Sequence, residues 1–179
     1  MNKKQHIKIS KFLSLILRHS PQKINLELDE NGWAKVDDIL VNDKVRIEFE
    51  DLTEVVKNCD KQRFTLNENQ TKIRAKQGHS IKEVDLELEP LTPPEFLYHG
   101  TVDKFMSEIK KDGLKKMSRQ HVHLSNDRET AVKVGSRRGT PIILSVRSGE
   151  MQRKGFEFFQ SKNGVWLTDT VPAEYIEFK

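Results

Sequence analysis

A proline-rich segment near the middle of the chain separates two stretches whose patterns of apolar and polar residues differ. Pro90, Pro93 and Pro94 follow a run in which acidic residues at 83, 85, 87 and 89 alternate with apolar ones. Because proline stiffens the backbone, this pattern predicts a strand that leads into a stiff linker. The 179 residues suffice for two small domains. We therefore expect one lobe over residues 1–89 and a second over residues 90–179.

Before the prolines, the sequence predicts three short helices followed by a hairpin. Apolar residues recur at helical spacing over 7–17, and Pro21 ends that helix just after Arg18 and His19. Further helices are predicted to start at Asp37 and to span 49–58, with an extended segment at 33–36 and paired strands at 63–66 and 71–75. This order is typical of a winged-helix module, a form of helix-turn-helix often used on nucleic acids.

After the prolines, short strands alternate with helices. Strands are predicted over 96–98, 121–125, 141–147, 156–160, 165–167 and 175–178, and helices over 105–111 and 127–136. We expect an α+β fold class overall, with a mixed, mostly β second lobe.

The composition excludes several classes of protein. The longest apolar run, at 12–17, is far shorter than the roughly 18 residues of a membrane span, and residues 1–10 are polar and basic rather than signal-like. The single cysteine, Cys59, permits neither an internal disulfide nor a multi-cysteine zinc site. We expect a cytoplasmic protein without a membrane partner.

The positive charge is unevenly distributed along the chain. Residues 1–94 hold 16 basic and 16 acidic residues, whereas residues 104–154 hold 13 basic and 5 acidic ones. Such a basic stretch suits an anionic partner, and a solvated lysine face explains it equally well.

Histidine and arginine recur beside small polar residues, while the common nucleotide- and metal-binding motifs are missing from the sequence. The clusters lie at 18–19, 63, 77–80, 99–101, 118–123 and 135–139. Arginine presents a planar fork of donors that matches phosphate oxygens, and glycine beside histidine permits a ligand to approach the main chain. Together the clusters indicate a phosphate-bearing substrate.

Each cluster also has a structural explanation. Arg18 and His19 can complement the dipole of a helix end, and Arg63 can be a solvated strand residue. His121 and His123 share one face of a predicted strand, where a metal could bind, but no third ligand is nearby in the sequence.

In these clusters the sequence resembles the RNA 2′-phosphotransferase family over nearly the whole chain. The matching stretches are 15–19 (LILRH), 31–33 (NGW), 60–64 (DKQRF), 73–80 (IRAKQGHS), 98–101 (YHGT), 117–125 (MSRQHVHLS) and 163–168 (NGVWLT). The resemblance implies a winged-helix lobe that engages RNA and an ADP-ribosyltransferase-like lobe that holds NAD+, with no metal. It also implies that an internal RNA 2′-phosphate is transferred to NAD+ through a 2′-phospho-ADP-ribosyl RNA. The products are 2′-hydroxyl RNA, nicotinamide and ADP-ribose 1″,2″-cyclic phosphate.

The resemblance also assigns roles to individual residues. The family's essential quartet falls on Arg18, His19, Arg63 and Arg119, and His19 alone among them can move a proton near neutral pH. Expected NAD+ contacts are His99, Gly100, Thr101, His123, Ser125 and Arg137. Expected contacts with the RNA substrate are Arg74, Gln77, Gly78, His79 and Ser80.

Two other functions remain open at this point. A mono-ADP-ribosyltransferase acting on nucleic-acid ends or protein is one, although the late catalytic glutamate common in such enzymes has no clear equivalent here. A non-catalytic RNA-binding protein is the other. We expect a monomer that acts on tRNA-like RNA, while the physiological RNA stays open.

Overall fold

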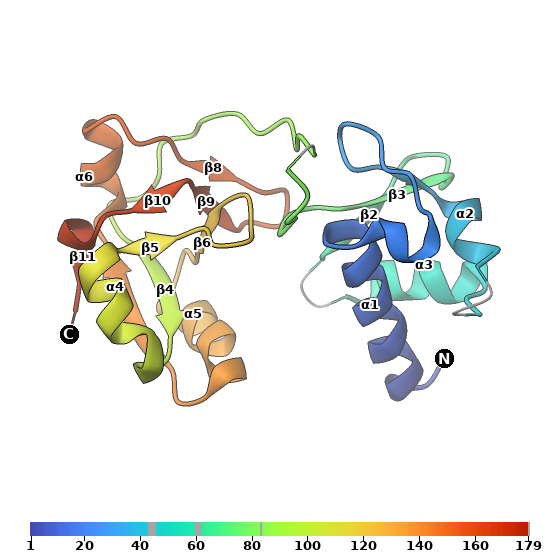
Figure 1. The fold of residues 1–179 in the computed structure, drawn as a ribbon, viewed down its shortest axis with the longest axis horizontal. Helices are drawn as coiled ribbons and strands as arrows, with labels where there is room; N and C mark the ends of the chain where they lie inside the picture. Colours follow the sequence, from blue (N-terminus) through green and yellow to red (C-terminus); the bar gives the residue numbers. More distant parts are fainter. Residues whose placement is uncertain (43–45, 60–61, 83, 179) are drawn as a thin grey trace. The chain divides into compact units, whose positions relative to one another are not determined.

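The computed structural model describes residues 1–42, 46–59, 62–82 and 84–178, and it divides the chain into two compact units, Met1–Glu87 and Leu88–Lys179 (Figure 1). Asp60 and Lys61 of the motif before Arg63, and Glu83 of the predicted strand, lie outside the described residues.

Unit 1 alternates helices with short strands. Its elements are α1 (Lys3–Arg18), a 3₁₀ turn (Pro21–Ile24), β1 (Ala34–Lys35), α2 (Val36–Leu40), α3 (Phe49–Lys57), β2 (Phe64–Leu66) and β3 (Lys72–Ala75). The strands form one antiparallel sheet in the order β1-β3-β2. The three predicted helices and the hairpin are confirmed.

The strand predicted over 83–89 is wrong where the structure describes it, because residues 84–89 form no strand. Alternating polarity suits a strand only when a partner strand supplies hydrogen bonds, and Glu87 instead adopts a positive φ of 52°. The backbone N–H of Asp85 donates to the carbonyl of Glu30, so this segment is held to a loop.

The core of unit 1 forms where α1 and α3 pack against the sheet. Its fully buried side chains include Leu13, Ile16, Leu17, Leu52, Phe64 and Ile73. Each such side chain contributes about 1.5–3 kcal/mol by leaving water. This packing holds the end of α1 beside β2 and β3.

Unit 2 is a mixed α and β unit built on small antiparallel sheets. Its elements are β4 (Leu97–Thr101), a 3₁₀ turn (Asp103–Phe105), α4 (Met106–Asp112), β5 (Leu114–Lys115), β6 (Val122–Leu124), α5 (Arg128–Gly135), a 3₁₀ turn (Ser136–Arg138), β7 (Ile142–Val146), α6 (Ser148–Arg153), β8 (Phe159–Gln160), β9 (Trp166–Thr168), β10 (Thr170–Val171), a 3₁₀ turn (Ala173–Tyr175) and β11 (Ile176–Glu177). The sheets run β11-β7-β4, β6-β9-β8 and β10-β5. This arrangement is compatible with the expected α+β class.

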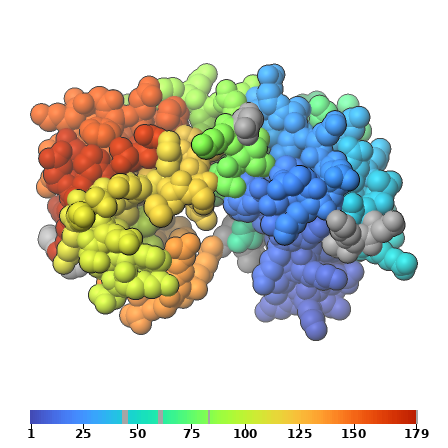
Figure 2. All heavy atoms as spheres, viewed as in Figure 1, coloured from blue at the N-terminus to red at the C-terminus, as the bar shows by residue number. Residues whose placement is uncertain are grey.

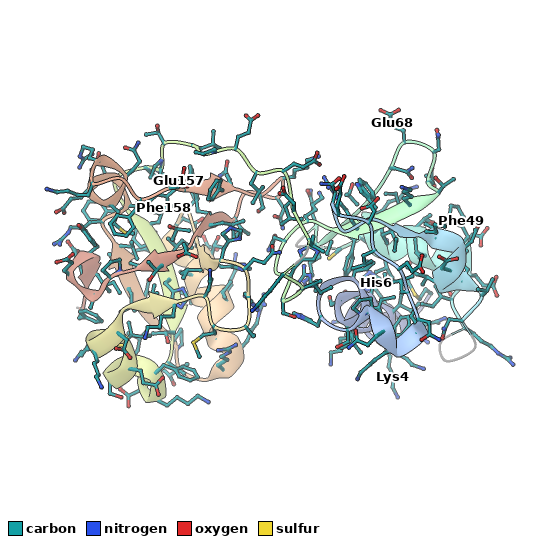
Figure 3. All side chains as sticks on the ribbon, turned by 45° about the horizontal axis from the view of Figure 1, so that its top comes forward. Lys4, His6, Phe49, Glu68, Glu157 and Phe158 are labelled. Atoms are coloured by element: carbon teal, nitrogen blue, oxygen red, sulfur yellow. The ribbon has the colours of Figure 1, made fainter. Side chains whose placement is uncertain are left out.

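Two backbone hydrogen bonds between Tyr98 and Ser125 join β4 to the end of β6. The strand predicted at 96–98 runs from Leu97 to Thr101 because all five residues pair with β7, so His99 is a strand residue. The core beneath includes Phe158, which is fully buried beside the exposed Glu157 (Figure 3). In the part of the chain that the structure describes, every helix is too short or too polar to cross a membrane.

Candidate functional site

In unit 1, the first cluster stands at the end of α1. Arg18 is the last helical residue, and the backbone N–H groups of His19 and Ser20 both donate to the carbonyl of Leu15, at 3.1 and 2.8 Å. Pro21 then starts a new turn, because proline cannot donate the next helical hydrogen bond. The side chains of Arg18 and His19 are thus presented where the helix stops.

Ser80 ties this helix end to the segment after β3. Its backbone N–H donates to the carbonyl of Arg18 at 2.8 Å, and its hydroxyl lies 3.4 Å from the same oxygen. The Nδ1 atom of His19 lies 3.0 Å from that hydroxyl. A hydroxyl that donates its one proton to the carbonyl of Arg18 accepts from Nδ1, and in that arrangement Nε2 is the nitrogen of His19 that can take up a proton.

His79, the residue before Ser80, is buried. Its side chain is 0% exposed, and neither ring nitrogen has a hydrogen-bond partner among the described residues. Burial, followed by the positive charges of Arg18, His19 and Arg74, lowers the pKa of His79 to about 4. His79 is therefore neutral at pH 7, and it places an uncharged polar ring near several cations.

Arg74 is held by the protein itself. It is 6% exposed, and its guanidinium stacks on Trp33 with 4.6 Å from Cζ to the ring centroid. Its Nη1 donates to the carbonyl of Asn31 at 3.3 Å and lies 3.8 Å from Glu87. These contacts lock the position of its charge near His79.

The remaining predicted residues of unit 1 flank this group. Arg63 precedes β2 and its Nη1 lies 3.7 Å from the sulfur of Cys59, while the ring of the next residue, Phe64, lies 5.9 Å from Cζ of Arg18. Gly78 has a φ of 82°, which favours glycine, and Gln77 precedes it with its Oε1 buried.

In unit 2, the structure brings His99, His123 and Arg119 together. The Nδ1 of His99, on β4, lies 3.0 Å from the carbonyl oxygen of His123, on β6. A carbonyl can only accept, so His99 carries its proton on Nδ1 and presents Nε2 as an acceptor. Arg119 donates from Nη1 to Nδ1 of His123 at 3.2 Å, so the ring proton of a neutral His123 is on Nε2.

Gly100 is required for the packing of α5. A Cβ atom there would overlap the carbonyl oxygen of Ala131 in α5, so the absence of a side chain lets α5 lie on β4. Thr101 follows and is buried. The backbone N–H and carbonyl of Ser125 both form hydrogen bonds with the backbone of Tyr98.

Comparisons with known proteins add a decisive observation to this geometry. The sequence profile of the "RNA 2'-phosphotransferase, Tpt1 / KptA family" matches residues 4–170. A protein of Flavobacterium johnsoniae named "Probable RNA 2'-phosphotransferase" is 63% identical, and the match covers 100% of both chains. The chain belongs to this family. Proteins of the same printed name from Trichormus variabilis, 52% identical over 98% of both chains, and Fusobacterium nucleatum, 50% identical over 96% of this chain and 98% of the relative, agree.

For this member of the RNA 2′-phosphotransferase family, the sequence predicts an NAD+ contact at Arg137 and none at the next residue, Arg138. The positive charge of Arg138 acts on His99, and the Arg138 guanidinium lies 5.8 Å from the ring of Phe105. Arg137 and Arg138 share the exposed 3₁₀ turn after α5, where successive side chains point in different directions. No signal in the sequence distinguishes them.

His123 lies in β6 and His121 directly precedes it, and in this phosphotransferase-family chain their side chains have different neighbours. His121 stacks against Phe159 with 5.8 Å between ring centroids, whereas His123 contacts Arg119. Among the described residues, no three histidine, cysteine, aspartate or glutamate side chains gather closely enough to hold a metal ion.

Proposed function

We propose that this protein is an NAD+-dependent RNA 2′-phosphotransferase that moves an internal RNA 2′-phosphate to NAD+. Family membership over the full chain supports the reaction class. The observation that carries the proposal is the pairing of Arg18 and His19 at the end of α1, where His19 contacts Ser80, the residue after a neutral buried histidine. A cation and a proton-transferring group side by side are what a phosphate nucleophile and its later release require.

We further propose a winged-helix identity for unit 1. The observed order of α1, β1, α2, α3, β2 and β3, with β1 beside β3 in one sheet, supports it. For unit 2 we propose an ADP-ribosyltransferase-like lobe, which the small antiparallel sheets around His99 support.

In unit 1, Arg18 and Arg63 would hold the 2′-phosphate by charge. His19 would accept or return a proton at Nε2, since its Nδ1 is held by Ser80. The neutral state of His79 matters because a charged ring there would repel Arg18 and Arg74.

In unit 2, NAD+ would supply an electrophilic ribose carbon with nicotinamide as the leaving group. His99 suits a ribose hydroxyl, because its Nδ1–H is spent on the carbonyl of His123 and its Nε2 accepts. Burial, and then the charges of Arg138 and Arg119, lower the pKa of His99, so the ring stays neutral at pH 7. Arg119 and Arg138 would stabilise phosphate charge nearby.

The test is a product assay with labelled NAD+ and RNA that carries one internal 2′-phosphate. ADP-ribose 1″,2″-cyclic phosphate and 2′-hydroxyl RNA are the expected products. Stable label on RNA or protein would instead establish a mono-ADP-ribosyltransferase, and binding without any product would establish an RNA-binding protein.

A matched pair of variants ties the activity to the site. Arg119→Ala should lower kcat by about 100-fold or more, because a donor aimed at developing charge is lost. Because Arg119 is exposed, the circular dichroism spectrum and the unfolding midpoint of the Arg119→Ala variant should match those of the wild type. Arg46→Ala removes the same charge from an exposed residue of unit 1 and should keep wild-type turnover. Wild-type turnover by Arg119→Ala would reject the assignment.

A further inference from the structure

One face of α1 carries a row of lysines that leads to Arg18. At 100° per residue, Lys4, Lys11 and Arg18, spaced by seven, lie within about 40° of one another, and Lys8 lies about 40° beyond Lys4. We name Lys4, Lys8 and Lys11 the α1 lysine ridge.

The ridge faces solvent. All three lysines are exposed, while Ile9, Leu13 and the other buried residues of the helix lie on its opposite side. α1 forms part of the surface of unit 1 (Figure 2), and Lys4 points away from the body of that unit (Figure 3). In the part of the chain that the structure describes, none of the three lysines forms an ion pair.

Every acid among the described residues of unit 1 lies outside α1. Six exposed or half-buried acids lie on or beside the other two helices, and the remaining ones lie in loops. The six are Asp37 and Asp38 on α2, Glu48 before α3, and Glu50, Asp51 and Glu54 on α3. Two of them contact the start of α1, at the Met1 amine and the Gln5 amide. Equal numbers of acids and bases in this half of the sequence therefore conceal a basic helix and an acidic one.

This segregation decides which helix suits RNA. In winged-helix proteins the helix that enters a groove is usually the one in the position of α3. Here that helix presents carboxylates, which repel phosphates, whereas α1 presents lysines without carboxylate partners.

The basic stretch of unit 2 is a weaker candidate than its sequence suggests. Many of its cations are already paired with acids: Lys115 with Asp112, Lys116 with Asp169, Lys133 with Glu129, Arg147 with Glu150 and Arg153 with Glu95. An RNA phosphate would have to compete with these carboxylates, so RNA binding to these cations would be weaker than to unpaired lysines.

We propose that the α1 lysine ridge binds the sugar-phosphate backbone of the RNA that flanks the 2′-phosphate nucleotide. This inference rests on the proposed function, because Arg18 is taken as the phosphate-binding end of the ridge. At 1.5 Å per residue, Lys11 lies about 10 Å and Lys4 about 21 Å from Arg18 along the helix axis. A substrate of two nucleotides cannot reach both Arg18 and Lys4, whereas a longer RNA can.

The length of the substrate therefore provides the test. The triple variant Lys4→Gln, Lys8→Gln, Lys11→Gln is compared with wild type on a 2′-phosphorylated dinucleotide and on a single-stranded 12-nucleotide RNA, about six times longer, with one internal 2′-phosphate. For the long RNA, KM should rise about 10- to 100-fold at low salt, and the slope of log KM against log salt should become shallower by about 2, since each single-strand contact contributes about 0.7. The kcat on both RNAs and the KM for the dinucleotide should be unchanged.

A control triple removes the same charge from other exposed lysines, at Lys35, Lys57 and Lys154. It should leave KM for the long RNA within about threefold of wild type, because only general charge is lost. An unchanged KM in the ridge variant, or an equal rise in the control, would overturn the proposal.

Failure of the proposed function would appear differently, as absence of turnover by wild type on both RNAs. Fluorescence anisotropy with the long RNA then tests RNA binding by the ridge independently of turnover. The ridge variant should bind the long RNA about 10- to 100-fold more weakly than the control triple. Equal binding by the two variants would refute the ridge.

Discussion

Acid should destabilise unit 1 through one buried histidine. His79 is 0% exposed, its ring nitrogens lack hydrogen-bond partners among the described residues, and the charges of Arg18, His19 and Arg74 act on it. Burial is the largest cause of its lowered pKa, which is about 4 rather than 6.5. The folded protein therefore resists a proton that the unfolded chain accepts readily.

The sign and size of the effect follow from linkage. Between pH 6.5 and pH 4 the unfolded chain binds a proton at His79 and the folded one does not, so the free energy of unfolding decreases as the pH falls. The pKa difference of about 2.5, at about 1.36 kcal/mol per unit, corresponds to a loss of about 3 kcal/mol. Above pH 6.5 His79 contributes no pH dependence.

The measurement is urea unfolding at several pH values from about pH 7 to about pH 4.5, within the window of the two pKa values. In a Trp166→Phe background, Trp33 is the remaining tryptophan and reports on unit 1 alone. His79→Asn removes the titration, so its free energy of unfolding should fall with acid by about 2–3 kcal/mol less than that of the parent protein. Parallel pH profiles for the two proteins would refute the argument.

Two further predictions concern unit 2. Gly100→Ala should lower the free energy of unfolding by about 3 kcal/mol, because its Cβ meets the backbone of Ala131. Gly155→Ala, with open space around it and a φ of 99°, should lower it by only about 1 kcal/mol. Chemical denaturation of both variants measures the two losses, and equal losses would contradict the packing argument. Arg138→Gln should raise the pKa of His99, because a nearby positive charge is removed; NMR titration of the ring protons measures this, and an unchanged pKa would show that Arg138 does not act on His99.

Elements with long local patterns could be predicted from the sequence. The apolar spacing of α1 and α3 and the paired runs of β2 and β3 depend on residues near one another in the chain. β5 and β10 were not predictable in this way, because each has two residues and forms only when Lys115 meets Thr170, far along the chain. α6, at six residues, is too short to show helical spacing.

The candidate site, too, could be predicted only in part from the sequence. Sequence patterns picked out Arg18, His19 and Ser80, and the structure places the three in contact. They did not separate Arg137 from Arg138, since the direction of a side chain on a 3₁₀ turn depends on what packs beneath it. They also predicted a ligand contact at Gly100, which stays a prediction, and the packing of α5 gives this glycine a second reason.

By itself, the order of amino acids determined which functional groups this protein possesses: guanidinium and imidazole side chains in a recurring series, in a chain of a known family. The charge that those groups carry was decided only by tertiary structure. His79 is neutral because folding buries it among cations, and Lys4, Lys8 and Lys11 form one row that faces solvent because α1 packs its opposite, apolar side into the core. Electrostatic energies depend on distance and solvation, and neither is written in the linear order of residues.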